Sequence, residues 1–258
     1  MTEYIIIAIV AFVGSGLTLF SGFGLGTILV PVFALFFPIE LSIILTAIVH
    51  FLNNLFKLAL LGKKADLKVI MYFGIPSVVA AIAGAYFLSR ISGIEPICEY
   101  ALLGKVFFIT PGKLLIALLM FVFALFEFVP KFKNMQIDKK YLPIGGLLSG
   151  FFGGLSGNQG ALRTVFLIKT NLSKEAFIAT GVVLACMIDI SRLSVYADKI
   201  IVNQASLDIT LILVATLSAF LGAFIGNKLI KKVTIGFVQN VVGIMLLVFS
   251  VLLGMGVI

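Results

Sequence analysis

The sequence predicts an all-α integral membrane protein, and three observations support this. Hydrophobic residues make up 61% of the 258 residues and charged residues only 12%, against roughly a quarter in soluble proteins. The mean hydropathy is +1.23, so a water-soluble globule could not hide the apolar surface. The apolar residues form long unbroken runs, not the alternating pattern of a membrane barrel. These observations exclude a secreted domain, a cytosolic enzyme and a nucleic-acid binder.

Eight apolar segments follow one another along the chain, separated by charged residues or by proline and glycine. A helical span needs about 20 residues, and the segments cover 4–37, 39–61, 67–89, 114–129, 141–168, 173–195, 207–227 and 234–257. The first and fifth have about 30 residues each, which as one straight helix would measure roughly 45 Å. Both are interrupted by glycines near their middle. We therefore expect these two to be broken or re-entrant helices and the other six to cross the bilayer.

The second half of the chain resembles the first. The Ser-Gly pair at 21–22 recurs at 156–157, and Asn54 falls opposite Asp189 at the same offset. The sequence therefore predicts a single transmembrane domain, 1–258, built from two repeats, 1–130 and 131–258. Each repeat has one broken or re-entrant helix followed by three transmembrane helices.

The distribution of basic residues favours re-entrant segments. If all eight segments cross, the Lys and Arg residues between them divide evenly between the two sides. If the first and fifth re-enter, most of the 19 Lys and Arg residues fall on one side, in loops near 62–66, 130–140 and 228–233. The positive-inside rule places such loops in the cytoplasm. Each repeat then crosses three times, so the two repeats are inverted relative to each other.

The two breaks are the main candidate for a binding site. Irregular backbone at membrane depth is tolerated only where it is buried in protein or lines a cavity. The half-helices that begin near Thr27 and Ala161 would point their positive N-termini at a common point, an arrangement that suits an anion. The alternative is close helix packing by small residues. The candidate residues are Ser21, Gly22, Gly24, Gly26, Ser156, Gly157, Asn158, Gln159 and Gly160.

Charged residues inside apolar segments are the second signal, because each costs roughly 3 kcal/mol at the bilayer centre unless it has a partner or faces water. Arg163 follows the second break by one turn and could hold an oxyanion with its fork of donors. Its alternative is a structural clamp. In the second segment, polar residues share one helix face, which is predicted to line the substrate pathway. In the sixth segment, an acid–base pair is predicted to lie on the same pathway. These residues are His50, Asn53, Asn54 and Lys57, and then Asp189 and Arg192. Of them, Asn53 and Asn54 are predicted to bind the substrate, and the other four to serve the pathway or its coupling. Snorkelling to the interface is the alternative for Lys57 and Arg192.

Other chemistry finds little support. Cys98 and Cys186 form no metal-binding spacing, so we expect neither a metal ion nor another cofactor. An intramembrane hydrolase would have to pair Ser21 or Ser156 with His50. We therefore keep an enzyme only as the weaker hypothesis. The expected partners are a small anionic substrate and the lipid bilayer, with no nucleic acid. A homo-oligomer is left open.

The doubled glycine pattern resembles the TauE/SafE family of sulfite and organosulfonate exporters. The resemblance lies in residues 22–26 with Val30 and Pro31, in 153–163, and in the stretches 179–182 and 189–192. It implies a multi-pass transporter of the prokaryotic inner membrane that exports sulfite or an organosulfonate such as sulfoacetate. An inside-negative voltage favours anion export by about 2.3 kcal/mol per 100 mV. The alternative is uptake of a sulfur-containing or carboxylate anion with a coupled cation.

Overall fold

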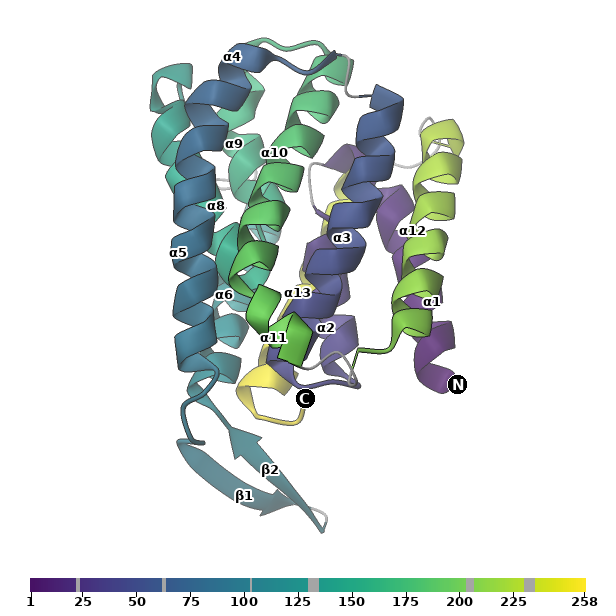
Figure 1. Ribbon diagram of the computed structural model, residues 1–258, viewed down its shortest axis with the longest axis vertical. Coiled ribbons are helices and arrows are strands. Elements are labelled where there is room, and N and C mark those ends of the chain that lie inside the picture. Colours follow the sequence, from purple (N-terminus) through teal and green to yellow (C-terminus); the bar gives the residue numbers. More distant parts are fainter. Residues whose placement is uncertain (22–23, 62–63, 103, 130–134, 203–206, 230–234) are drawn as a thin grey trace.

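The computed structural model describes residues 1–21, 24–61, 64–102, 104–129, 135–202, 207–229 and 235–258 and consists of a helical bundle with one β-hairpin at its end (Figure 1). The elements are α1 (Thr2–Ser21), α2 (Leu25–Ala34), α3 (Ile39–Leu61), α4 (Leu67–Val69), α5 (Ile75–Ile91), β1 (Cys98–Leu102), β2 (Lys105–Ile109), α6 (Pro111–Phe128), α8 (Leu142–Ser156), α9 (Gly160–Leu167), α10 (Lys174–Val195), α11 (Ala197–Val202), α12 (Ile209–Leu229) and α13 (Ile235–Gly254). A π-helical turn, Ile70–Gly74, joins α4 to α5.

The prediction of an all-α membrane protein is confirmed. In the described part of the chain, five helices are long and apolar enough to cross a membrane, namely Ile39–Leu60, Leu67–Ile91, Pro111–Phe128, Lys174–Val195 and Ile209–Gly226. Side chains fix where several of them begin. Thr110 accepts a hydrogen bond from the Lys113 amide at the start of α6, and Ser173 does the same for Ala176 at the start of α10. Such caps satisfy backbone donors that the helix itself leaves unpaired.

The first broken segment returns to the end of the bundle at which it starts. The Tyr4 hydroxyl at the start of α1 donates to Asp208, next to α12. The Lys199 ammonium in α11 donates to Glu40 at the start of α3. Since α11 leads directly into α12, the beginning of α1 and the beginning of α3 lie at one end, together with both chain termini (Figure 1). Helices α1 and α2 therefore form a hairpin.

The second broken segment re-enters from the opposite end. The Ile137 amide before α8 donates to the Val165 carbonyl in α9 over 3.2 Å, so the segment enters and leaves side by side. Helix α8 packs on α5 as α1 packs on α12, and α3 contacts α10 while α6 contacts α13. This pairing is what two related halves would give. The inverted repeats and their boundaries stay a prediction.

Glycines let the hairpin helices approach their partners closely. A Cβ at Gly146, Gly150 or Gly154 of α8 would lie only 2.1 to 2.2 Å from a backbone carbonyl oxygen of the continuous rod formed by α4, the π-helical turn and α5. A Cβ at Gly222 of α12 would lie 1.9 Å from the Phe12 carbonyl oxygen of α1. These contacts leave no room for a methyl group, so close packing of small residues holds both hairpins in the bundle.

Gly150→Ala is expected to lower the melting temperature of the purified protein, because its methyl group would lie 2.2 Å from the Ser77 carbonyl oxygen. Overpacking of this kind costs about 1–3 kcal/mol. Gly236→Ala is the control, since no atom of the described residues lies within 4 Å of the added Cβ, and alanine favours a helix over glycine. Thermal unfolding in detergent measures both variants. Equal melting temperatures would contradict this account of the α5–α8 contact.

The hairpin of β1 and β2 was not predicted from the sequence. Its strands pair antiparallel, with Tyr100 opposite Phe107, and extend beyond the helices at the end that carries the chain termini (Figure 1). The Tyr100 hydroxyl donates to the Met255 carbonyl over 2.6 Å, and the Lys113 ammonium donates to that of Gly256 over 3.3 Å. The first bond ties the hairpin to the C-terminal residues directly. Lys113 of α6 links the two as well, because its ammonium also donates to the Phe108 carbonyl of β2 over 3.2 Å.

Candidate functional site

The two helix breaks meet inside the bundle. A Cβ at Gly26, in the first turn of α2, would lie 3.2 Å from the Gly157 carbonyl oxygen in the second break. Gly22 lies outside the described residues, and so does the side chain of Ser21, whose backbone ends α1. Gly160 begins α9 directly after the second break. The N-terminal turns of α2 and α9 thus come together, as expected from the sequence, while their role in binding stays a prediction.

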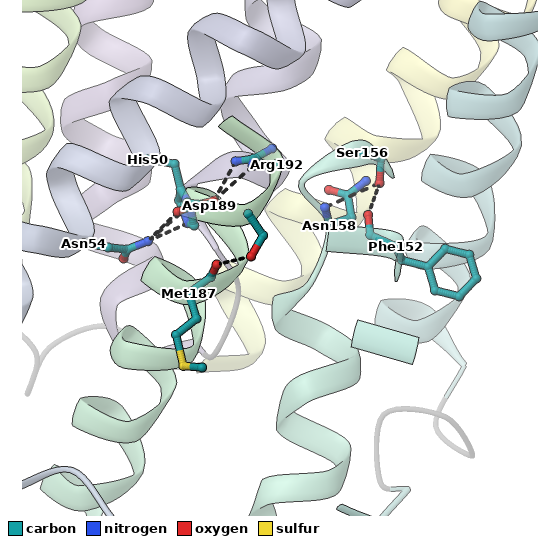
Figure 2. Close-up of polar contacts among 9 residues, drawn as sticks. His50, Asn54, Phe152, Ser156, Asn158, Met187, Asp189 and Arg192 are labelled. Atoms are coloured by element: carbon teal, nitrogen blue, oxygen red, sulfur yellow. Dashed lines mark hydrogen bonds and ion pairs between the residues drawn. The ribbon is translucent and has the colours of Figure 1, made fainter. Parts of the chain in front are cut away.

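Gly157 shapes the second break through its backbone. It has φ 78° and ψ −3°, the left-handed conformation that ends α8, and such φ values favour glycine. A Cβ there would also lie 2.9 Å from Arg192 Nη1. The Ser156 hydroxyl donates to the Phe152 backbone carbonyl over 3.0 Å and accepts from the backbone N–H of Asn158 over 3.4 Å (Figure 2). Ser156 therefore supports the break, and Arg192 packs against it.

Asp189 joins α3 to α10 through buried contacts. His50 Nδ1 lies 2.6 Å from Asp189 Oδ2, and Asn54 Nδ2 donates to the same oxygen over 3.3 Å (Figure 2). Arg192 Nε donates to Asp189 Oδ1 over 3.1 Å, and Nη2 lies 2.8 Å from it. A carboxylate accepts hydrogen bonds, so Nδ1 carries the hydrogen. The other ring nitrogen, Nε2, faces Gly24, where a Cβ would lie 3.0 Å away.

Several buried polar atoms around the second break have no hydrogen-bond partner within the described residues. They include Asn158 Oδ1, both amide atoms of Gln159, Arg163 Nη1 and Arg192 Nη1. The Arg163 guanidinium lies over Gly181 of α10, where a Cβ would be 3.4 Å from Nε. Leaving such groups unpaired inside a protein is costly. The amide nitrogen of Gln159 and the two guanidinium nitrogens are donors, whereas Asn158 Oδ1 and the Gln159 amide oxygen are acceptors. The donors, two of them charged, favour a ligand that accepts hydrogen bonds.

The charges around the breaks favour an anion. Lys57, Arg163 and Arg192 are no more than 8% exposed, and Asp189 is fully buried. Lys57 lies within electrostatic range of Arg163, and Arg163 within range of Asp189. Beside the breaks, the described residues thus include three buried basic side chains and two buried carboxylates, Asp189 and Glu127, the latter 3% exposed on the neighbouring cavity. Snorkelling does not describe Lys57 or Arg192, because both are buried in protein.

The structure shows a partner for Asn53, and three further polar residues near the breaks were not named as site residues. Asn53 exchanges hydrogen bonds with Ser15 of α1, at 3.0 and 3.2 Å, and so braces α1 on α3, while its role in binding stays a prediction. The Thr46 hydroxyl is buried without a hydrogen-bond partner, and its methyl group is 3.7 Å from a Cβ at Gly26. Glu127 is a charge inside the apolar segment 114–129, the same signal that marked Arg163. The third is Thr27, which the sequence analysis named as the start of a half-helix but not as a site residue.

A small cavity lies beside the breaks. Its volume is about 10 Å³, and it is lined by Thr27, Phe123, Glu127, Asn158, Ala161 and Leu246. This volume holds roughly one water molecule. An oxyanion that enters here therefore requires the lining side chains to move. Within the described residues, no three His, Cys, Asp or Glu side chains are grouped so as to hold a metal ion.

The chain was compared with known proteins. A family model described as "Sulfite exporter TauE/SafE" matches residues 6–253, which is almost the whole chain. No curated protein and no solved structure matches.

Proposed function

Because the chain belongs to the sulfite exporter TauE/SafE family, we propose that it exports a small sulfur-containing oxyanion across the cytoplasmic membrane of a prokaryotic cell. Sulfite, or an organosulfonate such as sulfoacetate, is the substrate class. The substrate binds where the two helix breaks meet. The protein acts as a transporter and not as an enzyme.

The unpartnered donors around the second break carry this proposal. Arg163 Nη1 and Gln159 Nε2 are buried beside the N-terminus of α9 without hydrogen-bond partners. Sulfite and sulfonates present three oxygen acceptors, which a guanidinium fork and an amide bind well. A helix N-terminus adds backbone donors and a favourable dipole. Each group is therefore complementary to the same ligand.

The electrostatic balance supports the same ligand class. Lys57, Arg163 and Arg192 outnumber the two buried carboxylates of Asp189 and Glu127 by one, and buried charge of one sign is unfavourable without compensation. A bound oxyanion supplies that compensation. An inside-negative voltage then drives the anion outward by about 2.3 kcal/mol per charge and 100 mV, so export needs no other energy source.

The test is transport by purified protein in liposomes under an imposed voltage, with sulfite, thiosulfate, sulfate and sulfoacetate. The wild type is expected to show saturable flux of at least one of these anions. Asn158→Ala removes an amide at the break and is expected to lower that flux by about 10-fold. Asn240→Ala is the control, because Asn240 is exposed on α13. Folded protein that moves none of the four anions would overturn the proposal.

Uptake of an anion with a coupled cation is the second candidate. The observation that favours it is the buried contact between His50 and Asp189 at 2.6 Å, since such a pair can carry a proton. Collapsing the pH gradient at a fixed voltage distinguishes the two mechanisms. Unchanged flux would refute proton coupling, whereas a loss of flux would support it.

A further inference from the structure

Tyr196 has an unexplained hydroxyl group. The residue caps the C-terminal end of α10, is 0% exposed, and its hydroxyl has no hydrogen-bond partner among the residues that the structure describes. The surrounding core is apolar and includes Ile39, Ile43 and Ile116. A buried hydroxyl without a partner destabilises a fold, and phenylalanine would fill the same space without this cost. The position therefore points to a ligand that the hydroxyl contacts during function.

Arg192 lies one helical turn before Tyr196. The Tyr196 amide donates to the Arg192 carbonyl over 3.2 Å, and side chains four residues apart share one helix face. Asp189 holds Nε and Nη2 of Arg192, while Nη1 has no partner and faces Gly157 of the second break. Asp189 thus fixes the guanidinium, and one of its N–H groups remains available.

These two side chains lie between the breaks and the end of the bundle that carries both chain termini, which the distribution of basic residues predicts to face outwards. Helix α10 runs from the end that carries α4 towards the end that carries both chain termini (Figure 1). Tyr196 is within electrostatic range of both Arg192 and Glu40. Glu40 pairs with Lys199 at the surface, where both side chains are partly exposed. The order towards the outside is therefore Gly157, Arg192, Tyr196 and the Glu40–Lys199 pair.

We propose that Arg192 and Tyr196 form a second anion subsite, which receives the oxyanion from the breaks before it leaves the protein. The inference rests on the proposed function. The Arg192 N–H and the Tyr196 O–H donate to oxygens of the ligand, and the guanidinium charge excludes a cation. Because Arg192 contacts the second break itself, the oxyanion passes from Arg163 to Arg192 without crossing an apolar stretch.

Tyr196→Phe tests the subsite, because it removes one oxygen atom and leaves the ring. Sulfite flux is measured in liposomes at a series of concentrations applied to the outer face, together with the melting temperature. The variant is expected to raise the half-saturating concentration by about 10-fold and to melt at the wild-type temperature or above. Tyr72→Phe is the control, since Tyr72 is 63% exposed, and its flux is expected to match the wild type.

Two results would overturn the subsite, and they are distinguishable. If the wild type transports sulfite and Tyr196→Phe shows the same concentration dependence, the subsite is wrong and the break site stands. If the folded wild type transports no oxyanion, the proposed function fails and the subsite fails with it. A purely structural Tyr196 predicts a change in melting temperature without a change in half-saturation.

Discussion

Arg163→Gln is expected to reduce oxyanion flux by roughly 10- to 100-fold. A hydrogen bond to a charged group contributes about 1.5–3 kcal/mol, and 1.4 kcal/mol corresponds to a factor of ten. Glutamine retains a polar side chain but lacks the charge and the fork of donors. Flux in liposomes under a fixed voltage measures the effect. Arg90→Gln is the control, because Arg90 is exposed and contacts only Tyr86 among the interactions described.

The stability of the same variant separates binding from a structural clamp. Arg163 Nη1 has no hydrogen-bond partner, and the neighbouring Lys57 has the same charge. Removing the guanidinium is therefore expected to leave the melting temperature unchanged or higher. A large loss of stability together with normal flux in the folded fraction would identify Arg163 as a clamp.

Asp189→Ala is expected to destabilise the protein by about 3–5 kcal/mol, because it leaves the guanidinium of Arg192 buried without its carboxylate. His50 and Asn54 lose their shared acceptor as well. Thermal unfolding in detergent, with the yield of monodisperse protein, measures the effect. Asp198→Ala is the control, since Asp198 is exposed on α11.

A double variant identifies the cause of that loss. Replacing both Asp189 and Arg192 with leucine and methionine removes the pair together, and such replacements are often neutral or stabilising. Asp189→Leu with Arg192→Met is therefore expected to recover most of the stability and to remain inactive in transport. A double variant as unstable as Asp189→Ala would show that the carboxylate acts mainly through His50 and Asn54.

Much of the fold could be predicted because the bilayer limits the choice. Each span has to satisfy its own backbone and hide it from lipid, so apolar length alone placed α3, α10 and α12 within a few residues of their ends. The excess length and the glycines of the first and fifth segments marked both breaks. The hairpin of β1 and β2 was missed, because it lies between apolar segments, where bilayer length gives no signal.

The candidate site was predictable only in part. Arg163 and Asp189 could be predicted because each is a charged residue inside an apolar segment. The free-energy cost of burying a charge in the membrane does not depend on which neighbours the helix has. The same signal marks Glu127, which was overlooked near the end of its segment. Asn53 shares a helix face with His50 and Asn54 but bonds Ser15. Which neighbour an amide meets depends on how the helices pack, and helical spacing does not contain that information.

The sequence alone determined that the chain is a helical membrane protein with two broken segments and buried basic residues, because hydrophobicity, helix length and charge are local properties. Only the tertiary structure decided that both segments re-enter, that Gly26 meets Gly157, and that His50 joins the predicted pair of Asp189 and Arg192. It also left the Tyr196 hydroxyl without a partner. The reason is that these contacts join residues more than 100 positions apart, or depend on the neighbours that packing brings, and the packing of helix on helix sets the distances between them.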